Sequence, residues 1–187
     1  LARRVADAGA AAVTIHGRTA AQSYSGSADW DLVAEIARML PIPVFGSGDC
    51  VEPEQIVQRM ASGVSGVLVG RGVLRNPWIL GQAADLAAGR PPRQVSLTDR
   101  GRFLLEYIDL LLLDGRDEVA GFRHTIGDAA STERATRGRE RWVVNKVRAL
   151  CAWYSKGIEG GSALRSRVNT AQSVVELREL VDEFFFV

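Results

Sequence analysis

Three short apolar runs divide the first half of the chain, and each is followed by a polar or glycine-rich loop and a helix-like segment. The runs cover residues 11–15, 42–45 and 67–69. The loops after them read His16-Gly17-Arg18-Thr19, Gly46-Ser47-Gly48-Asp49 and Gly70-Arg71-Gly72. Repeated strand–loop–helix units are typical of a parallel β/α barrel, in which chemistry takes place at the carboxyl ends of the strands. Glycine-rich loops before helices also suit a phosphate bound by backbone N–H groups. This half is therefore predicted to be the part of a barrel enzyme that binds the phosphate of a cofactor.

Local signals define the elements of this first half. Apolar and β-branched residues predict strands over 12–16, 44–46 and 66–70. Apolar residues at helical spacing predict helices over 30–40, with Asp29 as N-cap, and over 52–62, and a short helix opens at 76–78. Residues 1–9 read as the second half of a helix, and three strands cannot close a barrel of eight. We therefore expect a fragment, or an incomplete gene product, that lacks the N-terminal half of the barrel.

The second half of the chain is predicted to be wholly helical. A proline- and glycine-rich break at 89–93 separates it from the first half. Apolar spacing predicts helices over 98–114, 139–155 and 174–185, which would pack as a small bundle. The predicted fold class is therefore α/β. Residues 1–90 form the C-terminal part of a TIM (β/α)8 barrel, and residues 91–187 form a small all-α helical domain.

Composition narrows the class of protein. Hydrophobic residues make up 47% of the 187 residues, which supports a folded core, and the net charge is +1. No apolar stretch approaches the ~18–20 residues of a transmembrane helix, and no signal-peptide pattern opens the chain. Cys50 and Cys151 have neither metal-binding nor redox spacing. We therefore expect no metal, no membrane partner, two inert thiols that pack as small hydrophobes, and a cytoplasmic location.

One segment of the helical half is strongly basic. Residues 131–168 hold nine Lys or Arg and three Glu, a local net charge of +6. Trp142, Trp153 and Tyr154 are interleaved with these charges, and aromatic rings can stack on unpaired bases. The segment is therefore a candidate docking face for a polyanion. The alternative is a solvated helical face whose aromatic residues belong to the core.

Seven motifs, in this order along the chain, carry a resemblance to a known family. They cover residues 13–19 (VTIHGRT), 24–30 (YSGSADW), 43–49 (PVFGSGD), 66–72 (GVLVGRG), 76–78 (NPW), 152–157 (AWYSKG) and 164–165 (LR). The chain resembles the C-terminal part of a bacterial tRNA-dihydrouridine synthase over nearly its whole length. Ser47 departs from the family, which usually has Asn at that position.

The resemblance implies an FMN- and NADPH-dependent enzyme that reduces uridine in tRNA to 5,6-dihydrouridine. In this family reduced FMN gives a hydride to the uracil ring, and a cysteine protonates the neighbouring carbon. The target base must leave the stack to reach the flavin. The family's catalytic cysteine is expected upstream of residue 1 and matches neither Cys50 nor Cys151, so no catalytic residue is assigned within this chain. The fragment alone is expected to be inactive.

Site residues follow from the motifs. The cofactor-binding candidates are His16, Ser47, Gly48, Asp49, Gly70 and Arg71. The carboxylate of Asp49 could touch the ligand, or it could serve as the N-cap of the following helix, or both. The candidates for tRNA contact are Arg18, expected to be exposed, and Arg148, Lys156 and Arg165, which flank the Trp153-Tyr154 turn.

Two other functions fit the same residues. One is a different FMN-binding phosphate-barrel oxidoreductase, against which the basic helical half argues. The other is a non-catalytic tRNA-binding remnant. For the leading hypothesis we expect FMN and NADPH as cofactors, tRNA as partner and a monomeric protein.

Overall fold

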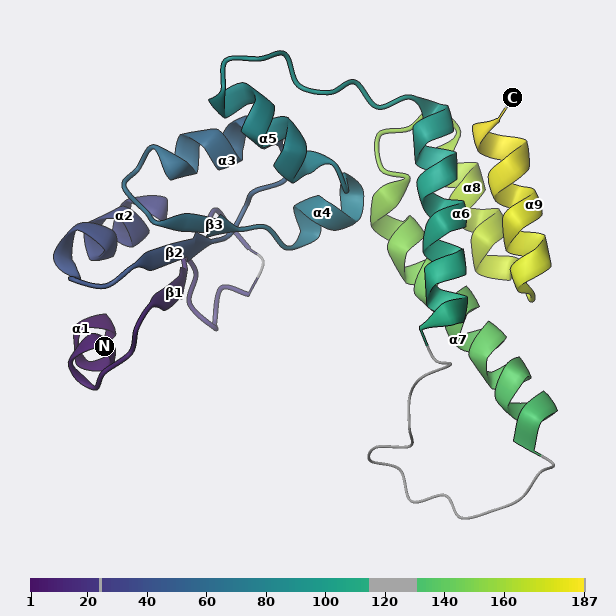
Figure 1. Ribbon diagram of the computed structural model, residues 1–187, viewed down its shortest axis with the longest axis horizontal. Helices are drawn as coiled ribbons and strands as arrows, with labels where there is room; N and C mark the ends of the chain where they lie inside the picture. The colour runs from purple at the N-terminus through teal and green to yellow at the C-terminus, as the bar shows by residue number, and fades with distance from the viewer. Residues whose placement is uncertain (24, 115–130, 187) are drawn as a thin grey trace. The chain divides into compact units, whose positions relative to one another are not determined.

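The computed structural model describes residues 1–23, 25–114 and 131–186, apart from the side chains of 131–137. The chain divides into two compact units, Leu1–Arg93 and Gln94–Val187 (Figure 1). The first unit is α/β and the second is helical in its described part. Within the described residues, no helix is long and apolar enough to cross a membrane.

The first unit is built on a sheet of three parallel strands. These are β1 (Val13–His16), β2 (Val44–Ser47) and β3 (Gly66–Leu68), in the order β1-β2-β3. Val13 lies opposite Val44, and Phe45 lies opposite Gly66. The predicted parallel α/β arrangement is thus confirmed. The third strand ends two residues earlier than the sequence suggested, because the chain turns at Gly70 into a helix.

Five helices accompany this sheet in the described part of the first unit. They are α1 (Ala2–Asp7), α2 (Trp30–Met39), α3 (Pro53–Met60), α4 (Arg71–Arg75) and α5 (Ile79–Ala87). The side chain of Asp29 accepts a hydrogen bond of 2.9 Å from the N–H of Leu32, which confirms it as the N-cap of α2. The short helix α4 was not predicted, and it places Arg71 directly after β3.

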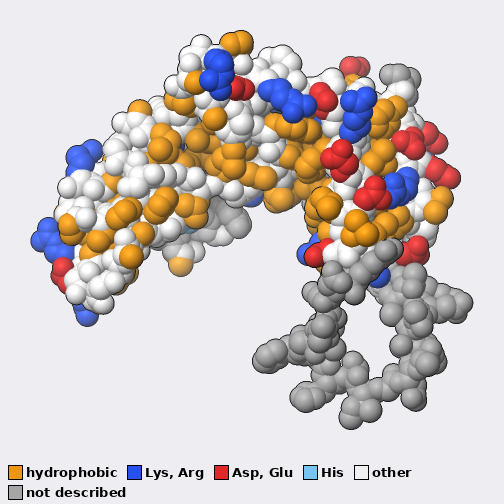
Figure 2. Space-filling view, viewed as in Figure 1, with side chains coloured by type: hydrophobic (Ala, Val, Ile, Leu, Met, Phe, Trp, Pro, Cys, Tyr) orange, Lys and Arg blue, Asp and Glu red, His pale blue; other side chains and the backbone are white. Residues whose placement is uncertain are grey.

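The core of the first unit lies beside the indole of Trp30. Trp30 packs with Val33, Ile56 and Ile79, all of them buried. Gly46 in β2 makes room for the indole, since a Cβ at that position would lie 2.3 Å from a ring carbon of Trp30. Other large apolar side chains of this unit are exposed, among them Leu32 and Met39 of α2, Met60 of α3, Leu68 of β3 and Leu80 of α5. Figure 2 shows hydrophobic side chains gathered on the face of this unit that is turned to the viewer.

The second unit packs its helices around a separate core. They are α6 (Leu97–Leu113), α7 (Ser131–Tyr154), α8 (Gly161–Thr170) and α9 (Val174–Phe185). The bounds of α9 match the prediction, whereas α8 was not predicted. Leu104, Tyr154 and Leu177 are fully buried in this core. The hydroxyl of Tyr154 donates a 2.9 Å hydrogen bond to the carbonyl of Arg100, and this bond ties α7 to α6.

Candidate functional site

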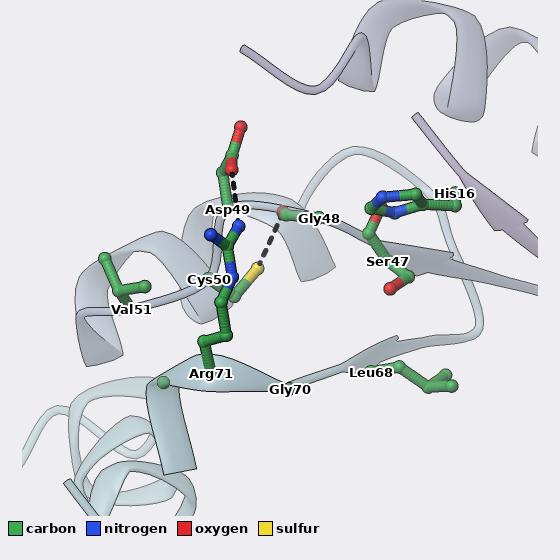
Figure 3. Close-up of a pocket in the computed structure, with 10 residues that line it drawn as sticks. His16, Ser47, Gly48, Asp49, Cys50, Val51, Leu68, Gly70 and Arg71 are labelled. Atoms are coloured by element: carbon green, nitrogen blue, oxygen red, sulfur yellow. Dashed lines mark hydrogen bonds and ion pairs between the residues drawn. The ribbon is translucent and has the colours of Figure 1, made fainter. Parts of the chain in front are cut away.

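A cavity of ≈ 250 Å³ opens at the carboxyl ends of the three strands. All six residues predicted to bind a cofactor line it (Figure 3): His16, Ser47, Gly48, Asp49, Gly70 and Arg71. Its other lining residues were not predicted: Cys50, Val51, Leu68 and Gly72. Three loops that are far apart in the sequence therefore meet at one edge of the sheet, as expected for parallel strands. No three His, Cys, Asp or Glu side chains gather as a possible metal site within the described residues.

The loop after β2 is shaped by Gly48. Its φ of +127° is rarely adopted by other residues, and an added Cβ would lie 2.6 Å from the Cβ of Ala28. The indole Nε1 of Trp30 donates a 2.9 Å hydrogen bond to the Gly48 carbonyl and so fixes the loop. Trp30 therefore both packs in the core and holds the cavity loop, and its indole N–H was the signal that could have revealed the second role. At Gly70, by contrast, an added Cβ would meet no atom within 4 Å.

The imidazole of His16 is fixed by the neighbouring strand. Its Nδ1 lies 3.0 Å from the carbonyl oxygen of Ser47. Because a carbonyl oxygen can only accept, Nδ1 carries the proton. In the neutral ring, Nε2 is then left as a hydrogen-bond acceptor on an exposed side chain.

Asp49 joins two loops through its carboxylate. Its Oδ2 accepts hydrogen bonds from the Arg18 guanidinium at 2.8 Å and from the N–H of Ala28 at 2.6 Å. Its Oδ1 lies 3.8 Å from the guanidinium of Arg71. Desolvation by burial raises the pKa of this carboxyl, but the bonds from Ala28 and Arg18 and the charges of Arg18 and Arg71 outweigh it. The pKa of Asp49 therefore lies below its ordinary value.

Two expectations for this region were wrong. The first made Arg18 an exposed contact for RNA, whereas its side chain is only 3% exposed. Its guanidinium is turned inward because it also donates to the carbonyls of Ser25 and Gly26, at 3.2 and 2.6 Å. The second was one of the two alternatives for Asp49, that it is the N-cap of the following helix, but that position belongs to Glu52.

The start of α3 uses its own side chains for capping. The Gln55 carbonyl oxygen accepts hydrogen bonds from the N–H groups of Val51 and Glu52, at 2.8 and 3.1 Å. The Glu52 side chain in turn accepts from the backbone of Gln55. The N–H groups of Val51, Glu52 and Gln55 at the start of α3 therefore already have hydrogen-bond partners.

The three candidates for RNA contact in the helical unit differ in their surroundings. The Arg148 guanidinium donates to the carbonyls of Val168 and Ala171, at 3.3 and 2.5 Å, and so caps the C-terminus of α8. Arg165 donates to the hydroxyl of the buried Ser155 at 2.9 Å. Lys156 is exposed, and its ammonium lies 4.0 Å from the centre of the Trp153 ring. Of these three residues, only Lys156 is exposed.

A second cavity lies within the helical unit. Its volume is ≈ 640 Å³, and its lining is polar and charged apart from one valine: Glu140, Arg141, Val144, Asn145, Arg148, Asn169 and Gln172. The remaining part of the basic segment is only partly described. The side chains of Arg134 and Arg137, and Tyr24 of the second motif, lie outside the described residues.

Both cysteines are buried and unpaired, as expected of small packing residues. Desolvation raises the pKa of Cys50, and it raises the pKa of Cys151 to about 12. The Cys50 thiol lies 3.5 Å from the carbonyl of Gly48 (Figure 3). Neither thiol is therefore placed or ionised as a reactive group.

Comparison with known proteins gives one consistent match. A family model described as "Dihydrouridine synthase (Dus)" matches residues 1–186. A "Probable tRNA-dihydrouridine synthase" of Mycobacterium leprae (strain TN) is 34% identical over 180 residues, which are 94% of this chain and 41% of the relative. One of Rickettsia prowazekii (strain Madrid E) is 28% identical over 189 residues, 99% of this chain and 50% of the relative. The chain thus spans half or less of the length of these curated relatives.

Proposed function

This chain belongs to the dihydrouridine synthase (Dus) family, and we propose that it forms the cofactor-phosphate end and the RNA-binding part of an enzyme that reduces uridine in tRNA. The proposed reaction converts uridine to 5,6-dihydrouridine with FMN as cofactor and NADPH as reductant. The observation that carries this proposal is the cavity where His16, Gly48, Gly70 and Arg71 meet at the carboxyl ends of parallel strands.

The residues of the cavity fit the phosphate of FMN. The backbone at Gly70 faces open space, so an anionic group can approach it closely. The side chain of Arg71 is 35% exposed and supplies a charge-assisted donor at the same wall. Gly48 keeps the opposite loop tight against Ala28 and His16, so the cavity has fixed walls.

The chain's own residues would bind and orient the cofactor. When bound, FMN would supply the hydride that the uracil ring receives. His16 presents Nε2 as an acceptor because Nδ1 is held by Ser47, and this fixed tautomer can orient a hydrogen-bond donor of a ligand. The proton for the neighbouring carbon of uracil is not assigned to this chain, since neither Cys50 nor Cys151 matches the family's catalytic cysteine.

The exposed surfaces of the first unit support a place in a larger barrel. Among the described residues, β1 and β3 each pair only with β2, so two strand edges are open. Leu68 in β3 is 44% exposed and Leu80 in α5 is 55% exposed. We propose that further strands and helices of a TIM barrel cover these edges and side chains.

The helical unit is the proposed RNA-binding part. Lys156 and Trp153 offer an exposed cation beside an aromatic ring. Arg141 and Asn145 line the polar cavity on α7. Phosphate contacts from such groups position an RNA, and aromatic rings stack on its unpaired bases.

The test uses the complete gene product with FMN, NADPH and unmodified tRNA. Dihydrouridine formation and a preference for FMN over riboflavin, which lacks the phosphate, are the expected results. Replacing Arg71 by Ala removes a charge-assisted bond worth ~1.5–3 kcal/mol and is expected to weaken FMN binding about ten- to a hundredfold, with little effect on riboflavin. Bound FMN without dihydrouridine formation would favour another flavin oxidoreductase. Bound tRNA without bound FMN would favour a tRNA-binding remnant.

A further inference from the structure

Arg18 is the most deeply buried of the three charged side chains Arg18, Asp49 and Arg71, and no contact with a ligand is assigned to it. Its side chain is 3% exposed, against 29% for Asp49 and 35% for Arg71. The three side chains carry charges of +1, −1 and +1, so the cluster sums to +1. This cluster lies at the wall where an anionic ligand is proposed to bind.

The two arginines are not equivalent partners of Asp49. Arg18 makes a hydrogen-bonded ion pair of 2.8 Å, whereas Arg71 stays 3.8 Å from the other carboxylate oxygen. If Arg18 were absent, Arg71 would be the nearest cation to an uncompensated carboxylate. Asp49 would then draw the Arg71 guanidinium to itself and repel an anion in the cavity.

We propose that Arg18 is a positioning residue that neutralises Asp49 and thereby keeps the charge of Arg71 available to the phosphate of the cofactor. The proposal rests on the function proposed above and gives a role to an arginine that does not itself line the cavity but is bonded to Asp49, which does. It explains why a carboxylate is tolerated beside a site for an anion. The Arg18 guanidinium that compensates this carboxylate is itself buried, so salt screens its charge less than that of an exposed cation.

Stability alone does not account for Arg18. Its Nη1 is buried and has no hydrogen-bond partner within the described part of the chain, which is an unfavourable state for a charged group. Removing Arg18 alone would leave the Asp49 carboxylate without its closest cation and can itself cost stability. The role of the Arg18 charge in binding is therefore judged by comparing the single variant with a double variant in which both charges are absent.

The experiment varies the cluster charge in the complete gene product and measures the ratio of FMN to riboflavin affinity. The cluster charge is 0 in Arg18→Met, +1 in the wild type and in Arg18→Met/Asp49→Asn, and +2 in Asp49→Asn. We expect the preference for FMN to fall about tenfold in Arg18→Met and to return toward the wild-type value in the double variant. Asp49→Asn is expected to raise the preference, and the differences are expected to shrink as salt is added.

A matched pair of the same unit serves as the control. Arg90 and Asp85 form an ion pair of 2.7 Å away from the cavity lining. Arg90→Met and Asp85→Asn change the net charge by the same amounts and are expected to leave the FMN preference unchanged.

The possible outcomes separate the two proposals. Equal binding of FMN and riboflavin by the wild type would refute the phosphate site itself. A wild-type preference for FMN that is the same in Arg18→Met, or that is not restored in the double variant, would refute the role of Arg18 alone. If Arg18→Met does not fold, Asp49→Asn must still prefer FMN more strongly than the double variant does, and an equal preference would overturn the proposal.

Discussion

A Cβ on Gly48 would lie 3.3 Å from Cε1 of the His16 ring, so the loop after β2 and the imidazole at the end of β1 are in direct contact. Gly48→Ala is expected to displace His16 and to force an alanine into a φ of +127°. We expect a loss of roughly 1–3 kcal/mol in the free energy of unfolding, the range for strained backbone positions. Urea denaturation measures this loss, and flavin absorbance after dialysis measures the accompanying loss of bound FMN.

Gly70→Ala is the matched variant at the same cavity. An added Cβ at Gly70 would meet no atom within 4 Å, so Gly70→Ala is expected to lower the free energy of unfolding less than Gly48→Ala does. FMN binding is nevertheless expected to weaken, because the methyl group would enter the open space of the cavity. Equal destabilisation of the two variants would contradict this description of the loops.

Arg148 and Lys156 are expected to respond differently to replacement by Ala. Arg148→Ala leaves the carbonyls at the end of α8 without their donor and is expected to lower the free energy of unfolding by roughly 1–3 kcal/mol. Lys156→Ala is expected to leave stability unchanged, because the residue is exposed. In filter-binding titrations with tRNA at several salt concentrations, Lys156→Ala is expected to reduce the salt slope by about one. An unchanged slope would mean that Lys156 makes no phosphate contact.

The carboxyl of Asp49 is expected to make the free energy of unfolding depend on pH in the acidic range. Burial raises the pKa of Asp49, but the hydrogen bonds from Ala28 and Arg18 lower it by more. The pKa in the folded protein therefore lies below the ordinary 3.8. The corresponding stability is fully present above about pH 4 and is lost as the pH falls through the folded pKa. Urea unfolding at pH 7 and at pH 3 is therefore expected to show the advantage of the wild type over Asp49→Asn shrinking at the lower pH. A constant difference would contradict the lowered pKa.

Both thiols are expected to resist alkylation in the folded protein. Burial raises the pKa of Cys50 and that of Cys151, the latter to about 12, so the reactive thiolate is scarce at pH 8. Mass spectrometry after iodoacetamide treatment is expected to find no label on either residue in buffer, and a label on both in urea. Rapid labelling of Cys50 under native conditions would show that the loop after β2 opens to solvent.

Residues 1–187 alone are expected to form no dihydrouridine from tRNA with FMN and NADPH. The reason is that the family's catalytic cysteine matches neither Cys50 nor Cys151, both of which are buried. The complete gene product, assayed in parallel on the same unmodified tRNA, is the positive control. Turnover by the isolated chain at the rate of that control would show that another group supplies the proton.

The parts of the fold that depend on local pattern could be predicted from the sequence. Strand–loop–helix order follows from short-range periodicity, so the parallel sheet and the cavity-lining loops at His16, Gly48 and Gly70 were found. The helix α8 was missed because its buried positions are few, chiefly Leu164 and Val168, and do not form a long apolar stripe.

The roles of the arginines could not be predicted in the same way. Arg18 is buried because of Asp49, which is 31 positions later in the chain, and the motif around Arg18 holds no sign of that partner. Arg148 is used as a cap for α8, 20 positions away, so a basic helix face and a structural arginine look identical in the sequence. Charge patterns locate cations, but only tertiary contacts decide which of them face solvent.

The hydrogen bond from Trp30 to Gly48 also makes the site visible to spectroscopy. The indole is 4% exposed and is held 2.9 Å from a carbonyl of the cavity loop, so its environment is rigid and dry. An excited indole passes its energy to a nearby ring system that absorbs in the near ultraviolet, as flavins do. Binding of a flavin in the cavity should therefore quench the fluorescence of Trp30, so that this fluorescence reports whether the cofactor is bound.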